Sequence, residues 1–241
     1  MAHRQFLTSI RLIGMTHLLP LPGSPGYGGS RQHIYDRALA DASILQEAGF
    51  DAILVENFGD APYAKDDAGK HVVADMTALI TALQDELTIP IGVQVLRNDA
   101  TASIAVAAAT GARFVRINVH SGAMVTDQGL IEGRADETLR FRRSIDAREI
   151  SILADVFVKH GTPLAPCSLA DAVRDTVKEF YVRPAFQAFS VALCRALIAR
   201  SSAEFIEAQS NDALLSELLA VLTRDPTSDT LLFAAGEPTA L

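Results

Sequence analysis

Five short apolar runs of this sequence each end in polar or charged residues that could do chemistry. These clusters are Thr16-His17, Glu56-Asn57, Arg97-Asn98-Asp99, Arg116 with Asn118 and His120, and Asp155 with Lys159 and His160. Carboxylates and histidines can exchange protons with a substrate, while arginine and asparagine can bind an anion or a hydroxyl group. The clusters therefore predict one site for acid–base chemistry on a polar ligand.

Even spacing assigns the polar residues of the fourth run to one face. Arg116, Asn118 and His120 alternate with apolar residues at positions 115, 117 and 119. Side chains two residues apart on a strand point the same way. We therefore expect the three to face inward, as an anion clamp, an amide and an acid–base group.

The same spacing gives Asp155, Phe157 and Lys159 one face on the fifth run. If that face is the interior, an acid and an amine share the site. A desolvated lysine beside acids can act as a base or a Schiff-base nucleophile. A salt bridge or an anion-binding ammonium is the alternative for Lys159, and we favour it over covalent chemistry.

Glu56 allows two interpretations. Its carboxylate could act as a general base or bind a divalent metal through oxygen. Alternatively, it forms an ion pair with Arg97 or Arg116 that orients the site without taking part in the reaction.

The histidines also allow two interpretations. His17 and His120 could join Glu56 and Asp155 around a metal, but the sequence has no HxH or HExxH spacing, and we predict no metal site. Each is otherwise a hydrogen-bonding residue of the structure, and no particular cofactor is indicated. The predicted catalytic residues are Glu56, Asp155, Lys159 and His120, and the predicted substrate-binding residues are His17, Asn57, Arg97, Asn98, Arg116 and Asn118.

Other polar residues have plainer predicted roles. Asp99 stands where a strand passes into a helix and is expected to be an N-cap. The segment Thr126-Asp127-Gln128-Gly129 could cover the site as a lid, and a simple turn is the alternative. Asp66 and Asp67 are expected to lie in a solvated loop.

An alternation of strands and helices must position these residues. We expect strands at 10–15, 52–55, 91–96, 114–119 and 152–158, and helices at about 33–48, 72–86, 100–109, 136–146 and 168–179. Five such units imply parallel strands with right-handed crossovers. This is the α/β pattern of a TIM barrel, whose chemistry lies at the C-terminal strand ends.

After residue 180 the character changes. Residues 184–200 and 203–222 are expected to form two amphipathic helices, and only 230–234 resembles a short strand. Of the 15 glycines, all but Gly236 lie at or before Gly161. We therefore expect one barrel domain over residues 1–241, with five recognisable units over 10–179 and an incomplete or atypical, mostly helical tail over 180–241.

Composition narrows the class of protein. The 241 residues are 49% hydrophobic, and the formal net charge is −8 without a basic block, which argues against nucleic-acid binding. Cys167 and Cys194 show no metal-ligand spacing, and the N-terminus lacks the apolar core of a signal peptide. We expect a soluble cytoplasmic protein without an integral membrane segment, and leave peripheral membrane contact and a homo-oligomer open.

Several long motifs, in the same order, resemble the BtpA/SgcQ family. They are MTHLLPLPGSP, VENFGDAP, VLRNDA, INVHSGAMVTDQGLIEGRA and ADVFVKH, within residues 8–178. The resemblance implies a TIM barrel and, for some members, a link to photosystem I biogenesis. It also implies later glycine-rich segments of the VSG…TG and GSG type. This chain departs abruptly from that pattern near Phe180, as an alternative exon or a frameshift would produce.

Three functions follow as hypotheses. The first is an enzyme, namely a lyase, isomerase or hydrolase, that acts on a small polar or anionic, sugar-like metabolite. The second is a non-catalytic assembly or stability factor of the photosystem I biogenesis type. The third is a truncated, inactive variant.

Overall fold

The computed structural model describes residues 10, 12–178, 182–187 and 231–234. The strands are β1 (Leu12–His17), β2 (Ala52–Glu56), β3 (Ile91–Gln94), β4 (Phe114–Ile117), β5 (Ala123–Thr126), β6 (Gly129–Glu132), β7 (Ser151–Asp155), β8 (Thr162–Pro163), β9 (Val182–Gln187) and β10 (Leu231–Ala234). The helices are α2 (Arg31–Glu47), the 3-10 turn η1 (Phe58–Asp60), α3 (Lys70–Glu86), α4 (Ala100–Thr110), α5 (Ala135–Ser144) and α6 (Leu169–Lys178).

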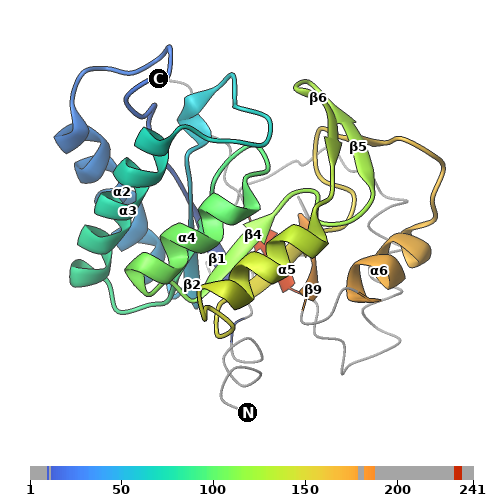
Figure 1. Ribbon diagram of the computed structural model, residues 1–241. Coiled ribbons are helices and arrows are strands. Elements are labelled where there is room, and N and C mark those ends of the chain that lie inside the picture. Colours follow the sequence, from blue (N-terminus) through green and yellow to red (C-terminus); the bar gives the residue numbers. More distant parts are fainter. Residues whose placement is uncertain (1–9, 11, 179–181, 188–230, 235–241) are drawn as a thin grey trace, which may run out of the picture.

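Parallel strands close into a barrel in the order β1-β10-β9-β7-β4-β3-β2. Helices α2 to α5 lie along one side of the barrel, outside strands β1 to β4, and the hairpin β5–β6 stands above it (Figure 1). The predicted α/β barrel is thus confirmed. Before residue 179, a helix follows each of β1, β2 and β3 along the chain, and α5 and α6 follow β4 and β7 after the intervening β5–β6 hairpin and β8. The short strand expected at residues 230–234 is also present, as β10.

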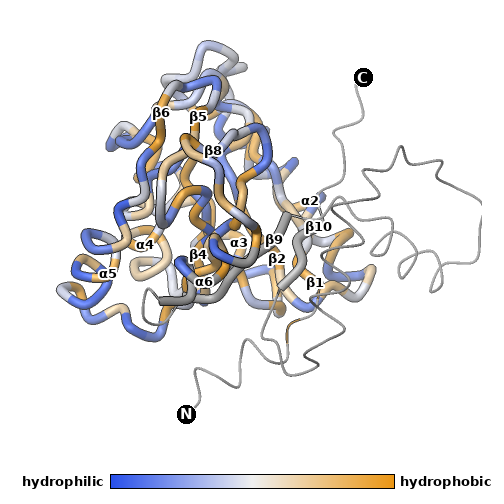
Figure 2. Tube along the Cα trace, turned by 90° about the vertical axis from the view of Figure 1, so that its right-hand side faces the viewer, coloured by the Kyte–Doolittle hydropathy of each residue, from blue (hydrophilic) through white to orange (hydrophobic). Residues whose placement is uncertain are grey.

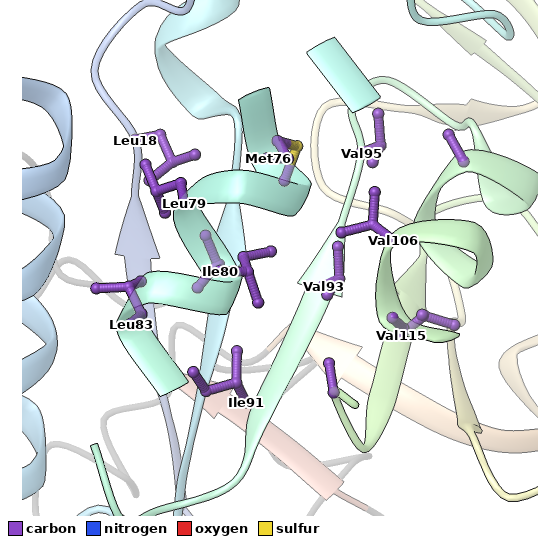
Figure 3. Packing of buried hydrophobic residues seen from close by; sticks show 14 of the residues in the cluster. Leu18, Met76, Leu79, Ile80, Leu83, Ile91, Val93, Val95, Val106 and Val115 are labelled. Carbon is purple, nitrogen blue, oxygen red and sulfur yellow. The ribbon is translucent and has the colours of Figure 1, made fainter. Parts of the chain in front are cut away.

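Strands β2, β4 and β7 divide their apolar side chains between two clusters. On the outer side, Ile53, Val93 and Val115 join a large apolar cluster with Met76 and Ile80 of α3 (Figure 3). On the inner side lies a separate cluster, which consists of Ile10, Ile13, Ala52, Leu54, Phe114 and Leu153. Strand β2 is buried along its whole length, as expected of a parallel strand covered on both faces. Figure 2 shows the same arrangement, with apolar strands inside and a hydrophilic α5 outside.

A glycine makes room for the largest inner side chain. A Cβ atom at Gly92 would lie 2.1 Å from the ring of Phe114, so only glycine fits on β3 at that level. Phe114 itself is completely buried. The interior is therefore filled with apolar side chains below the level at which the polar residues begin.

The predicted N-cap is confirmed. Asp99 accepts a hydrogen bond from the backbone N–H of Ala102 at 2.8 Å, and Gly111 ends α4 with a left-handed φ of 81°. The Asp99 carboxylate also accepts from the N–H of Ala68 at 2.9 Å, which ties the long β2–α3 loop to α4.

Two expectations about elements were wrong. Strand β4 ends at Ile117 and β7 at Asp155, both earlier than predicted. Between β4 and α5, the sequence analysis named no strand, and there β5 and β6 form an antiparallel hairpin that β8 extends to a three-stranded sheet. Residues 184–187 belong to β9 and do not begin a helix. The rest of the two helices expected in the tail, and Cys194, lie outside the described residues.

In the described part of the chain, no helix combines the length and apolar character needed to cross a membrane.

Candidate active site

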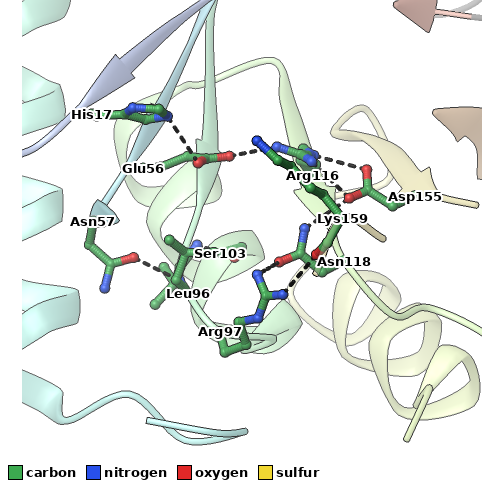
Figure 4. Close-up of polar contacts among 11 residues, drawn as sticks. His17, Glu56, Asn57, Leu96, Arg97, Ser103, Arg116, Asn118, Asp155 and Lys159 are labelled. Carbon is green, nitrogen blue, oxygen red and sulfur yellow. Dashed lines mark hydrogen bonds and ion pairs between the residues drawn. The ribbon is translucent and has the colours of Figure 1, made fainter. Parts of the chain in front are cut away.

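Arg116 is the centre of the polar layer above the inner core. From β4, its Nη1 donates to Glu56 Oε1 of β2 at 2.9 Å. Its Nε and Nη2 donate to Asp155 Oδ1 and Oδ2 of β7 at 2.9 and 2.8 Å, which is a bidentate pair (Figure 4). The polar ends of three strands therefore meet at one guanidinium. Asn118 also contacts Asp155. We refer to these four residues, Glu56, Arg116, Asp155 and Asn118, as the Arg116 cluster.

Burial sets the electrostatics of this cluster. All three charged side chains are at most 5% exposed. Burial alone would lower the pKa of Arg116, but Asp155 and Glu56 reverse this and raise it, so the guanidinium stays charged. Burial raises the pKa of Asp155, although Arg116 and Asn118 both favour its carboxylate form. One cation faces two acids, and Asp155 has an environment in which protonation is easier than for an exposed aspartate.

Asn118 and Arg97 extend the cluster toward the chain that follows β7. The Asn118 Nδ2 donates to Asp155 Oδ2 at 2.9 Å, and its Oδ1 accepts from Arg97 Nη1 at 3.1 Å. Arg97 Nη2 donates to the carbonyl of Lys159 at 3.2 Å. The expectation that Arg116 and Asn118 share an inward face is therefore confirmed.

His17 reaches the cluster from β1. Its Nε2 lies 3.6 Å from Glu56 Oε2, and its ring stacks on Phe58 with centroids 4.3 Å apart. The His17 side chain is 22% exposed, whereas that of Glu56 is 5% exposed. His17 is therefore the more exposed member of this pair.

Asn57 and Asn98 use their amides to hold backbone. Asn57 Oδ1 accepts from the N–H of Leu96 at 2.7 Å, and its Nδ2 donates to Asp60 at 2.9 Å. Asn98 donates to the carbonyl of Val119 at 3.0 Å and accepts from its N–H at 2.8 Å. Both were expected to bind substrate, and the structure places them as supports of the loops at the mouth.

His120 does not join the cluster. Its side chain is buried, and within the described part of the chain neither ring nitrogen forms a hydrogen bond. Burial and the charge of Arg142 on α5 lower its pKa to about 4. Because β4 ends at Ile117, the strand alternation that predicted an inward His120 no longer applies beyond Asn118.

Lys159 does not share a strand face with Asp155. Strand β7 ends at Asp155, and Phe157 and His160 adopt positive φ angles of 57° and 62°. These angles are unusual for non-glycine residues and turn the chain sharply. Lys159 therefore lies in a turn, and its contact with the site described above is made by its carbonyl group.

A cavity of about 400 Å³ opens beside the cluster. Asn118 and Asp155 contribute to its lining, and so does the exposed Cys167, an unpaired thiol. Most of the remaining wall is apolar and comes from the hairpin, the segment after β7 and α6, including Met124, Val158 and Leu164. The segment Thr126–Gly129 forms the turn of the hairpin, with Thr126 paired to Gly129, in agreement with the simpler of its two predicted roles.

Two residues of the mouth were not foreseen from the sequence. Gln94, at the end of β3, is 1% exposed, and its register partner on β2 is Glu56. Tyr63 donates to the carbonyl of Phe58 at 2.8 Å, and burial raises its pKa to about 12. The sequence did hold a signal for Gln94, namely a polar residue on a buried strand, two positions after Gly92. Tyr63 lies in a loop, and the sequence held no comparable signal for it.

The arrangement offers little to a metal ion. Among residues 12–178 and the described parts of β9 and β10, no three His, Cys, Asp or Glu side chains converge as metal ligands. Arg116 already supplies positive charge between Glu56 and Asp155. The chemistry available is proton transfer by carboxylates and ligand binding by guanidinium and amide groups.

Solved structures with the same fold are enzymes of several kinds. The chain is similar to 7,8-dihydropteroate synthase from Vibrio fischeri ES114, with 15% identity, a TM-score of 0.53 and coverage of 96% of this chain and 74% of that one. It is also similar to an L-ribulose 3-epimerase, with 12% identity, a TM-score of 0.52 and coverage of 96% and 83%. At such identities the likeness establishes the TIM-barrel fold alone.

Sequence relatives give the family. The photosystem I biogenesis protein BtpA of Synechocystis is 47% identical over 173 residues, which are 72% of this chain and 60% of that protein. The sgc region protein SgcQ of Escherichia coli K12 is 31% identical over 172 residues, or 70% and 63%. The chain thus spans less than two thirds of the length of these relatives. The BtpA family profile matches residues 8–187, and the chain belongs to the BtpA family.

Proposed function

We propose that this chain is an enzyme that acts on a small polar or anionic, sugar-like metabolite bound at the C-terminal ends of its barrel strands. The observation that carries the proposal is the Arg116 cluster, in which a buried guanidinium joins two buried carboxylates beside a cavity of about 400 Å³. A pair of titratable groups in unlike environments beside a cavity is a common mark of acid–base catalysis.

Stability alone gives a poor account of this cluster. Burying three charges costs solvation energy, and apolar side chains of similar volume are often at least as stabilising. The inner core directly below this cluster consists of apolar side chains. Apolar side chains in place of the charged ones would therefore extend that core. A role in binding or reaction accounts for the charges.

Glu56 and Asp155 are the acid–base candidates. Glu56 has a route to solvent through His17, whose ring lies 3.6 Å away, so it can act as a base that is reprotonated between turnovers. Asp155 lines the cavity, and burial raises its pKa above that of an exposed aspartate.

Arginine and amide groups would position the ligand. Asn118 lines the cavity directly, and Arg97 holds it in place. The buried Nε of Arg97 makes no hydrogen bond among the described residues and could donate to an anionic group of the ligand. We assign Lys159 to anion binding. We give His120 a supporting role, because its buried and unpartnered ring lies outside the cluster.

Ligand-dependent thermal unfolding tests this proposal. The probes are xylitol, D-ribose 5-phosphate and inorganic phosphate, each measured with the wild-type chain and with Glu56→Gln and Lys159→Met variants. A ligand at about 100 times its Kd stabilises the native state by about 2.7 kcal/mol, which raises Tm by roughly 5–10 °C. We expect Glu56→Gln to keep this shift and to lose about 100-fold or more of any turnover, and Lys159→Met to weaken binding of the phosphorylated probe.

A second candidate rests on the name of one relative. The Synechocystis protein is named for photosystem I biogenesis, and an assembly role would need no reaction. In that case Tm would respond to a protein partner and to none of the small molecules. The absence of any ligand-dependent shift in the wild-type chain would count against the enzyme.

A further inference from the structure

Gln94 is a buried amide with no partner. It ends β3 and is 1% exposed, yet neither its Nε2 nor its Oε1 forms a hydrogen bond in the described structure. Buried amides are nearly always hydrogen-bonded, because a buried donor or acceptor without a partner loses its hydrogen bonds to water and gains none in return. The position therefore needs an explanation other than packing.

The side chain of Gln94 faces the barrel interior. Two residues earlier, a Cβ atom at Gly92 would meet the ring of Phe114, which belongs to the inner core. Alternate residues of a strand share a face, so Gln94 projects the same way, one level higher. Val93 and Val95, which flank it, pack in the outer cluster against the helices.

The amide lies next to the acid of the cluster. Strands β2 and β3 pair in parallel with Glu56 directly opposite Gln94. The Glu56 carboxylate is committed to Arg116 on one oxygen and approaches His17 with the other. Thus the inner layer presents a donor and an acceptor beside a charged carboxylate.

Asn57, one residue after Glu56, is a buried amide at the mouth that does have hydrogen-bond partners. Asn57 is only 2% exposed. Its Oδ1 accepts a hydrogen bond from Leu96, and its Nδ2 donates one to Asp60. The chain can therefore satisfy a buried amide at this level of the barrel, and at Gln94 it does not.

We propose that Gln94 is a ligand-binding residue, whose amide donates to and accepts from a hydroxyl group of the bound metabolite next to Glu56. A hydroxyl group is itself both donor and acceptor, and so it matches a carboxamide. This inference rests on the proposed function and adds to it: the substrate carries a hydroxyl group at the carbon held nearest Glu56.

The stability of a matched pair of variants tests the first half of the argument. Gln94→Met and Asn57→Leu each replace a buried amide by an apolar side chain of similar size. We expect Asn57→Leu to lower Tm by about 3–8 °C, because the N–H of Leu96 and Oδ2 of Asp60 lose their hydrogen bonds to Asn57. Gln94→Met should leave Tm unchanged or raise it, since no hydrogen bond is lost. An equal fall of Tm in both variants would overturn the proposal, because the Gln94 amide would then already be engaged.

Binding tests the second half. Xylitol and D-ribose 5-phosphate are titrated into the wild-type chain, Gln94→Met and a surface control, Gln32→Met on α2, with isothermal calorimetry. We expect Gln94→Met to weaken binding about tenfold, the value of one hydrogen bond, and Gln32→Met to leave it unchanged. Equal affinities of wild type and Gln94→Met would overturn the role of Gln94 while leaving the enzyme intact. Failure of the wild-type chain to bind either probe would instead overturn the proposed function, and this inference with it.

Discussion

Arg116 and His120 are four residues apart in the chain, both are buried, and their surroundings are opposite. Arg116 donates three hydrogen bonds to two carboxylates, whereas His120 makes none. Carboxylate neighbours raise the pKa of Arg116, and burial with Arg142 nearby lowers that of His120 to about 4. Folding therefore keeps one side chain charged and the other neutral.

The end of β4 separates the two environments. Arg116 lies inside the strand and projects into the barrel, but the strand stops at Ile117. Asn98 then pairs with both backbone groups of Val119, which fixes the chain between Asn118 and His120. Asn118, directly after the strand, still reaches Asp155, whereas His120, two residues further along, does not.

The largest effect is expected where the charged environment is broken. Arg116→Met leaves Glu56 and Asp155 as two buried carboxylates without a cation, and removing one partner of a buried ion pair costs about 3–5 kcal/mol. We expect the free energy of unfolding in urea to fall by that amount. Arg116→Lys keeps the charge but not the bidentate fork, and its loss should be intermediate.

Arg140 provides the matched control. On α5 it pairs with Asp136 at 2.6 Å, but the two side chains are 76% and 69% exposed. Arg140→Met should cost well under about 1 kcal/mol, because exposed ion pairs contribute little. Similar losses for Arg116→Met and Arg140→Met would mean that the Arg116 cluster is accessible to water, against the burial described here.

The next effect concerns the neutral environment and depends on pH. The folded chain keeps His120 unprotonated down to a pKa of about 4, whereas the unfolded chain takes up the proton near 6.5. Between these values the unfolded state binds more protons, so stability falls as the pH falls. Over the interval from pH 7 to pH 4, this group should remove about 3 kcal/mol from the free energy of unfolding.

A His120→Leu variant isolates that contribution. Its free energy of unfolding should fall by about 3 kcal/mol less than that of the wild type between pH 7 and pH 4. The exposed His33 of α2 supplies the control, and His33→Gln should follow the wild-type profile. Parallel profiles of wild type and His120→Leu would show that folding does not exclude a proton from His120.

The sequence predicted the parts of the fold that depend on local pattern. The five apolar runs became barrel strands because each must be buried on both faces, and alternation correctly placed Arg116 and Asn118 inside. Asp99 was recognisable as an N-cap because its role is set by the residues that directly follow it.

Alternation failed where a strand ended earlier than its composition suggested. The run ADVFVKH is rich in strand-forming residues, yet the backbone turns at Phe157 and carries Lys159 off the face of Asp155. The turn packs against residues far away in the sequence, because Val158 joins Met124 and Ile131 of the β5–β6 hairpin in one apolar cluster. Contacts of that kind leave no local signal in the sequence. Gln94 was also missed because its role depends on a contact between strands. It lies beside Glu56 only through the register of β2 and β3.

The smallest effect is expected at Asn98, whose side chain holds Val119 between Asn118 of the Arg116 cluster and His120. Asn98→Ala removes two hydrogen bonds to Val119, at 3.0 and 2.8 Å, and should lower the free energy of unfolding by about 1–3 kcal/mol. The more telling measurement is the pH profile of Asn98→Ala. If Asn98 holds His120 away from the Arg116 cluster, loosening Val119 gives the His120 imidazole access to water or to an acid. The loss of stability between pH 7 and pH 4 then becomes smaller than in the wild type. An unchanged pH profile, with the same total loss of stability, would show that the position of His120 is set by its own packing and not by the pairing of Asn98 with Val119.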